Sequence, residues 1–192
     1  MNCFHDFTAP LWEIFIGNLL LLLCSLFYLI WWVVSYRPNS NGMSVTGGLY
    51  ITVAFITGIT AVALMSYGIN SLSSYSNGLP VRVILISVGV LFLILLPITT
   101  IIFHRILTEE LILIHIWAAL ELSAVDVLHG TGRFDSVRTI ILVTLIGIAT
   151  VVGLICYMLY YRLDELASYW NGMIPLITDA FVMLVFLLLL AF

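Results

Sequence analysis

The sequence contains no lysine, and its scarcity of charge sets the first limits on what the protein can be. Only 8% of the 192 residues are charged, whereas 63% are hydrophobic. Soluble domains contain roughly 25% charged and 45–50% apolar residues, so this composition is that of an integral membrane protein. The absence of lysine also excludes a retinal protein of the rhodopsin type, which needs a lysine amine for its Schiff base.

Basic residues are also too few and too scattered to bind nucleic acid. The six arginines form no cluster, and the net charge is −4, which argues equally against polybasic attachment to anionic lipid. The three cysteines show no CxxC or metal-finger spacing, and Cys24 and Cys156 lie in apolar runs, where cysteine packs as a small hydrophobic residue. The amino-terminal segment has no positive region typical of a cleavable signal, so we expect the first apolar run to stay in the mature chain.

Six apolar runs are long enough to cross a bilayer, which takes about 20 residues. The fold class is therefore all-α: a single transmembrane domain, 1–192, built as a polytopic helical bundle in contact with lipid. The segment between the last two runs, at 161–172, predicts a short interfacial stretch, and Pro175 then falls in the first turn of the last helix. The six predicted spans cover roughly residues 11–36, 48–70, 81–103, 104–129, 138–160 and 174–192.

Two halves of the sequence resemble each other. SYSNGLPV (74–81) is echoed by SYWNGMIPL (168–176), and GITAV (58–62) is echoed by GIATV (147–151). Spans 1–3 and 4–6, in units 1–103 and 104–192, therefore predict two copies of one three-helix unit. An odd number of spans makes the copies inverted, which is a recurring plan of secondary transporters.

The orientation in the membrane cannot be deduced from the positive-inside rule, because six spans place three arginines on each side. We expect a multi-pass protein of the plasma membrane, and the sequence leaves open whether it forms a homo-oligomer. Aromatic residues near the span ends predict a belt at the membrane interface. They are Trp31, Trp32, Tyr36, Tyr160, Tyr161 and Trp170.

The run at 104–129 holds an unusual number of ionisable residues. Such side chains are costly in hydrocarbon and usually face a bundle interior, a partner or water, so this is the candidate functional segment. At 100° per residue, His115, Asp126 and His129 share one face, and Glu121 lies on another. Glu109 and Glu110 begin this helix as first-turn acids and need no functional explanation.

Glu121 is the first candidate for a solute- or proton-binding residue. Small residues such as Ala118, Ala119 and Ala124 surround it, so we expect it to be buried against a neighbouring helix. A carboxyl group buried without a nearby cation can carry a proton, or it can hold two helices together through a hydrogen bond. The sequence favours neither role. Asn18 in the first span is a natural partner.

Glu13 and Asp179 are further partner candidates from the first and last spans. Their positions near helix starts also fit structural roles, which we favour for both. His115 and Asp126 lie about 16 Å apart along the axis and suit stations of a proton or cation relay. Asp126 and His129, three residues apart, can pair or hold a metal ion if other helices supply further ligands.

No cofactor is predicted. The sequence has no HExxH, no glutamate-rich dimetal pattern and no paired haem histidines. The leading hypothesis is a small permease or channel-like transporter for a proton-coupled small polar solute or ion, with no catalytic residues. One alternative is an integral-membrane enzyme acting on a lipid-like substrate at Asp126 and His129. The other is a non-catalytic partner or sensor subunit.

Overall fold

The structure, a computed structural model, describes residues 8–36, 45–75, 109–160 and 162–192, with side chains from Leu113 onward in the third range. Within these ranges the chain is α-helical apart from short turns, and it has no strand. Five helices there are long and apolar enough to cross a membrane, so the protein is an all-α integral membrane protein. They are α1 (Ala9–Ser35), α2 (Val45–Ser71), α4 (Glu109–Gly130), α5 (Ser136–Tyr160) and α6 (Glu165–Ala191), and a 3-10 turn η1 (Ser73–Tyr75) follows α2.

Four predicted spans, the first, second, fourth and fifth, agree with helices of the structure. The predicted third span at 81–103 lies outside the described residues, and so does most of the repeated motif at 74–81. The side chains of Glu109 and Glu110 also lie outside them, although α4 begins at Glu109.

The last helix begins earlier than the sequence predicts. α6 starts at Glu165, and Pro175 lies inside it instead of in its first turn. The Asp164 side chain caps the helix by accepting a hydrogen bond from the Ala167 N–H at 2.8 Å. The prediction that 161–172 is separate from the last helix is therefore wrong: residues 165–172 form the first turns of α6, and a bundle of transmembrane helices tolerates an internal proline.

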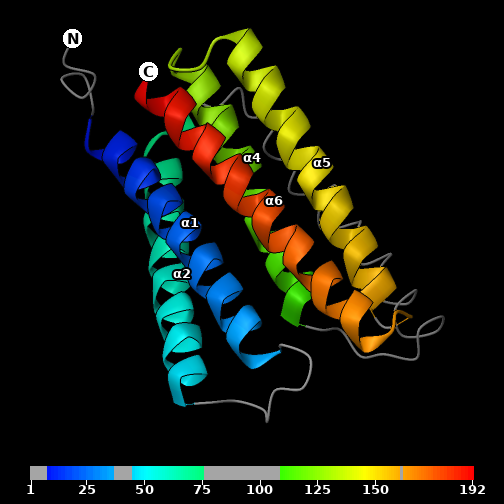
Figure 1. The fold of residues 1–192 in the computed structure, drawn as a ribbon. Coiled ribbons are helices and arrows are strands. Elements are labelled where there is room, and N and C mark those ends of the chain that lie inside the picture. The colour runs from blue at the N-terminus through cyan, green and yellow to red at the C-terminus, as the bar shows by residue number, and fades with distance from the viewer. Residues whose placement is uncertain (1–7, 37–44, 76–108, 161) are drawn as a thin grey trace.

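The five helices form a ring (Figure 1). Successive contacts run from α1 to α2, α4, α5 and α6, and α6 packs back against α1; the α1–α2 contact is the most extensive and the α2–α4 contact the least. In Figure 1, α1 and α5 descend while α2, α4 and α6 ascend, so the start of α1 and the end of α6 lie at the same end of the bundle.

Small residues bring α1 and α2 together. Gly47, Ala54, Ala61 and Gly68 recur every seven residues, which places them on one face of α2, and all four are buried. A Cβ atom at Gly68 would lie 2.8 Å from the backbone oxygen of Pro10 in α1. These small residues form a helix-packing surface.

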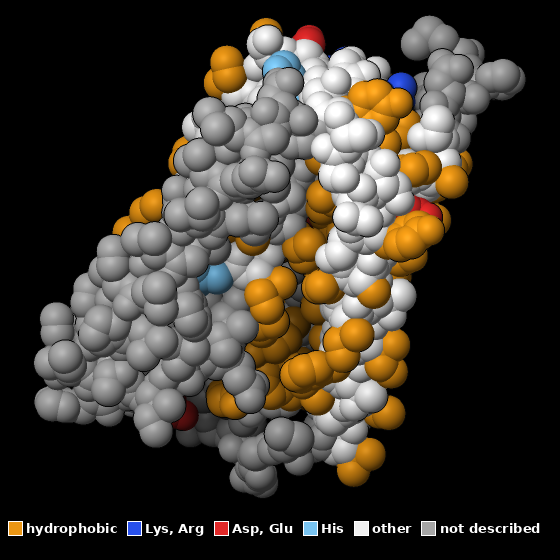
Figure 2. Space-filling view, turned by 180° about the vertical axis from the view of Figure 1, so that it is seen from behind, with side chains coloured by type: hydrophobic (Ala, Val, Ile, Leu, Met, Phe, Trp, Pro, Cys, Tyr) orange, Lys and Arg blue, Asp and Glu red, His pale blue; other side chains and the backbone are white. Residues whose placement is uncertain are grey.

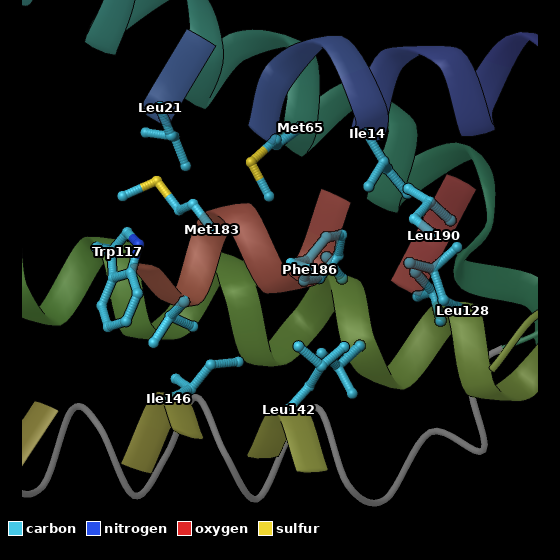
Figure 3. Close-up of a cluster of buried hydrophobic side chains, with 14 of the residues drawn as sticks. Ile14, Leu21, Met65, Trp117, Leu128, Leu142, Ile146, Met183, Phe186 and Leu190 are labelled. Carbon is cyan, nitrogen blue, oxygen red and sulfur yellow. The ribbon is translucent and has the colours of Figure 1, made fainter. Parts of the chain in front are cut away.

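Hydrophobic side chains fill the half of the ring next to the α4–α5 turn (Figure 3). All five helices contribute to this core. Its most completely buried members include Ile14, Met65, Leu128, Leu142, Ile146, Phe186 and Leu190.

The α4–α5 turn anchors the end of α6. Gly132 has a φ of +75°, a conformation that favours glycine. Asp135 caps α5 by accepting a hydrogen bond from the Arg138 N–H at 2.8 Å. The guanidinium groups of Arg133 and Arg138 donate to the carbonyls of Leu190 and Leu189 at 3.0 and 3.2 Å, which satisfies acceptors at a helix carboxyl end.

Candidate functional site

Glu121 is completely buried near the middle of α4 and hydrogen-bonds to α1. Its side chain has no exposed surface, and neither has that of Asn18. The Asn18 Nδ2 group donates to Glu121 Oε1 at 2.8 Å and to Oε2 at 3.0 Å. The prediction that Glu121 is buried against a neighbouring helix is confirmed, and Asn18 is the partner.

The local sequence allows this close approach. Ala118 and Ala124, on either side of Glu121 in α4, are 3% and 0% exposed. In α1, Gly17 precedes Asn18, and a Cβ atom there would collide with the Met65 side chain of α2. Small side chains beside both polar residues let the backbones approach and keep the pair away from lipid.

Asp179 supplies a second acidic group. It lies in α6, close enough to Glu121 for the two charges to repel each other. Because α6 begins at Glu165, Asp179 is far from the helix start, and the predicted stabilisation of its charge by that helix end is wrong. The described residues bring no cation to this acid pair, since Arg133 and Arg138 bind the end of α6 and Arg162 is exposed in the α5–α6 turn.

A cavity of about 480 Å³ lies in the other half of the ring. All five described helices contribute to its wall: α1 from Leu21 to Trp32, α4 up to Leu120 and α6 up to Met183. Neither Asn18 nor Glu121 lines the cavity. The lining residues nearest to them in sequence are Leu21 and Leu120, so the hydrogen-bonded pair lies just beyond the cavity floor, toward the packed core. Figure 2 shows hydrophobic side chains gathered in a hollow on this face of the molecule.

A few polar groups interrupt the apolar wall. Asp179 is the single charged residue among the described lining residues, and the Tyr28 and Tyr157 side chains also line the cavity. Trp117 is 7% exposed, and its indole Nε1 is buried without a hydrogen-bond partner among the described residues. Asn18 Oδ1 is likewise unsatisfied within the described part of the chain. Such groups are expected where a ligand or a proton completes the site.

His115 is buried in α4 and 6% exposed. It precedes Glu121 by six positions, which places it about 120° away around the helix. The structure therefore keeps these two titratable residues on separate faces, as the sequence predicts, and His115 does not line the cavity.

Asp126 and His129 do not form the predicted pair. His129 Nδ1 lies 3.0 Å from the Phe134 carbonyl oxygen and 3.1 Å from Thr139 Oγ1. Because the carbonyl can only accept, and the Thr139 hydroxyl already donates to the Asp135 carbonyl, Nδ1 carries the proton and donates to both oxygens. His129 therefore fastens the α4–α5 turn, a role that the sequence did not reveal because the fold brings its partners together.

Asp126 and Glu13 are half-buried acids outside the cavity. Asp126 Oδ2 and Glu13 Oε2 are each buried without a hydrogen-bond partner among the described residues. Glu13 lies in the second turn of α1, where its side chain is close to Gly68 of α2. No group of three or more His, Cys, Asp or Glu side chains within the described ranges is arranged to hold a metal ion.

Three aromatic residues assigned by sequence to the interfacial belt face the interior, and Trp31, like Trp32, is only 8% exposed. Trp32 is 8% exposed, its indole N–H donates to the Tyr169 carbonyl at 3.0 Å, and its ring packs against Gly172. Trp32 and Tyr160 both line the cavity. A tryptophan near a span end gives the same sequence pattern whether it faces lipid or protein, so the sequence alone could not distinguish these two positions. Tyr36 and Trp170 are exposed, as an interfacial belt requires.

Comparison with known proteins found no matching family model, no matching curated protein and no matching solved structure.

Proposed function

We propose that this integral membrane protein is a small proton-coupled transporter of a solute or ion in the plasma membrane, with Glu121 as the proton-carrying residue. The observation that carries the proposal is the buried Asn18–Glu121 hydrogen bond, which lies just beyond the cavity floor. Ionisable residues inside a membrane bundle commonly belong to substrate or proton routes.

The charge balance around Glu121 supports a proton or cation at this site. Two ionised carboxylates close together in an apolar interior repel each other and lack solvation. The described residues offer Glu121 and Asp179 an amide but no guanidinium. Protonation of one acid, or a cation bound beside them, relieves both costs.

Asn18 can form a hydrogen bond with Glu121 whether the carboxyl group is ionised or protonated. In the observed arrangement its Nδ2 group donates to both carboxyl oxygens, a geometry that suits the ionised form of Glu121. A half-turn of the amide would present Oδ1 to the hydroxyl of a protonated carboxyl group, and Oδ1 has no other partner among the described residues. An asparagine therefore keeps a hydrogen bond to either form of the acid, which suits a residue that gains and loses a proton.

The asymmetry of the ring supports alternating access. A cavity occupies one half of the bundle and a packed hydrophobic core fills the other, with Glu121 between them. Transport would require the packed half to open and the cavity half to close. The α2–α4 contact is the least extensive in the ring, so relative movement at that contact would disrupt the least packing.

Helix directions support six spans and an inverted repeat within this proposal. α2 and α4 run in the same direction (Figure 1), which is the relation that a further span between them would give; the predicted third span, 81–103, lies outside the described residues. The repeat would pair α1 with α4 and α2 with α5, and each of these pairs runs in opposite directions. Inverted repeats of this kind place transport sites near the midplane, and Glu121 lies near the middle of α4.

The test is proton movement in liposomes that contain the purified protein and an enclosed pH-sensitive dye. Gradients of methylammonium, acetate, urea and tetraphenylphosphonium serve as probes. We expect at least one probe to change the internal pH, and we expect Glu121→Gln to abolish that change. Glu165→Gln, an exposed residue in the first turn of α6, is the matched control and should behave like the unmodified protein. Equal probe-driven proton movement in Glu121→Gln would contradict the proposal.

A further inference from the structure

We propose that the cavity binds an amphipathic organic cation, whose apolar body packs against the aromatic wall and whose positive charge lies beside Asp179. Binding of this ligand is a property of the cavity. Transport of this ligand in exchange for a proton rests on the function proposed above. Its binding does not.

The size and chemistry of the cavity require an apolar body. A volume of about 480 Å³ lies within the range of roughly 300–1,000 Å³ typical of small-molecule sites. Most of the wall is apolar, with contributions from residues such as Leu21, Ile59, Val62 and Leu120. A small polar solute would lose its hydration there and find few partners, which is costly.

The charge of the wall selects a cation. Asp179 is the single charged residue among the described lining residues, and a second acid, Glu121, lies just beyond the floor. No basic side chain contributes to the described wall. An anion would be repelled by whichever of the two acids is ionised, whereas a monovalent cation would offset that charge.

Aromatic rings add a second attraction for a positive charge. Tyr28, Trp117 and Tyr157 line the cavity from three different helices. Cations within about 6 Å of an aromatic ring centre are attracted to its face, most strongly to tryptophan, and the effect grows when water is excluded. This arrangement favours ammonium or phosphonium groups that carry organic substituents.

The Trp117 indole N–H can donate a hydrogen bond to the ligand. It is buried and has no partner among the described residues. Figure 3 shows the nitrogen edge of this ring turned toward Met183, which also lines the cavity. The donor is therefore available to one acceptor atom of a bound molecule.

A bare metal ion fits this cavity poorly. Hard cations such as Ca²⁺ take six to eight oxygen ligands. The wall supplies one carboxylate and a few hydroxyl and amide groups, and no metal-binding group is found within the described residues. The organic class of cation is therefore favoured over an inorganic one.

The experiment compares two probes of the same shape and opposite charge, tetraphenylphosphonium and tetraphenylborate. Their binding to the full-length protein in nanodiscs is measured by equilibrium dialysis, with empty nanodiscs subtracted. We expect saturable binding of tetraphenylphosphonium and no saturable binding of tetraphenylborate. Equal binding of the two ions, or none of either, would overturn the proposal.

Two pairs of variants locate the site. Asp179→Asn should weaken tetraphenylphosphonium binding by about tenfold or more, which corresponds to roughly 1.4 kcal/mol, whereas Glu165→Gln should not change it. Val62→Phe places a ring in the cavity and should block binding, whereas Val143→Phe, on an exposed position of α5, should not. Binding that survives both Asp179→Asn and Val62→Phe would place the cation elsewhere and overturn the proposal.

The native cysteines give a readout that needs no change to the wall. Cys24 and Cys156 both line the cavity. In a Cys3→Ser background, bound tetraphenylphosphonium should slow their alkylation by N-ethylmaleimide by several-fold, and tetraphenylborate should not. An unchanged alkylation rate at a saturating concentration of the cation would contradict binding in this cavity.

The failure of this inference can be told apart from the failure of the proposed function. If the cation binds but does not change the internal pH of liposomes, the cavity binds a cation and the proposed function is contradicted. If a probe changes the internal pH but the cation does not bind in the cavity, only this inference is contradicted.

Discussion

The Asn18 side-chain amide lies 2.8 and 3.0 Å from the two carboxyl oxygens of Glu121 and joins α1 to α4 across 103 positions of the sequence. Both side chains are fully buried. The contact separates an apolar cavity from a packed core, so it contributes both to the stability of the bundle and to the chemistry of the site.

Removing the amide should destabilise the fold because Glu121 remains buried without its donor. We expect Asn18→Leu to lower the free energy of unfolding by about 1–3 kcal/mol, measured by detergent-induced unfolding. Asn70→Leu, at an exposed position of α2, is the matched control and should have little effect.

The double variant Asn18→Leu/Glu121→Leu should recover much of that stability, because replacing both partners leaves no unsatisfied polar group. If the double variant is as unstable as the sum of the two single variants, the hydrogen bond does not couple the two residues.

Close packing of α1 on α2 predicts a sharp difference between two glycines of the same helix. At Gly68 an added Cβ would lie 2.8 Å from the Pro10 backbone oxygen, whereas nothing lies within 4 Å of one added at Gly48. Gly68→Ala should lower the free energy of unfolding by about 1–3 kcal/mol. Gly48→Ala should leave it unchanged or raise it by up to about 1 kcal/mol, because alanine favours the helix. Similar effects of the two changes would show that the helices are farther apart than the structure describes.

The positions of the helices, and the burial of Glu121, could be predicted from local features of the sequence. Apolar runs of sufficient length indicate spans, and the small residues around Glu121 indicate a neighbouring helix. The start of α6 could not be predicted in the same way. The polar residues at 165–172 resemble a loop, and Pro175 resembles a helix start, until Asp164 is seen to cap the longer helix.

The cavity could not be predicted because it depends on how five helices close into a ring. Trp32 and Tyr160 occupy positions near span ends that are equally consistent with lipid contact. The role of His129 depends on Phe134 and Thr139, which come close only when the α4–α5 turn forms. The roles of Glu121, His115, Asp126, Asp179 and Glu13 in binding stay predictions.

His129 should matter for stability and not for transport. His129→Ala removes a donor shared by the Phe134 carbonyl and Thr139 Oγ1, and we expect it to lower the free energy of unfolding by about 1 kcal/mol. Thr139→Val should have a smaller effect that does not add fully to that of His129→Ala. Proton movement in liposomes should persist in both variants. A metal ion that co-purifies with the protein and is lost in His129→Ala would instead favour the enzyme hypothesis.

The proposed six spans would place both chain ends on the same side of the membrane. The start of α1 and the end of α6 lie at one end of the bundle (Figure 1). In a cysteine-free background, single cysteines at Thr8 and Phe192 should therefore react with a membrane-impermeant maleimide from the same side of sealed vesicles. Labelling of the two positions from opposite sides would require an odd number of spans and would rule out two equal inverted repeats.

Infrared difference spectroscopy can detect whether Glu121 exchanges its proton as the cavity is occupied. Tetraphenylphosphonium is added to the protein in nanodiscs, and the carbonyl stretch of protonated carboxyl groups is recorded. We expect this band to lose intensity when the cation binds, because Glu121 releases its proton, and we expect Glu165→Gln to preserve the change. The same loss of intensity in Glu121→Gln would contradict the account, as would binding of the cation without any change in the band.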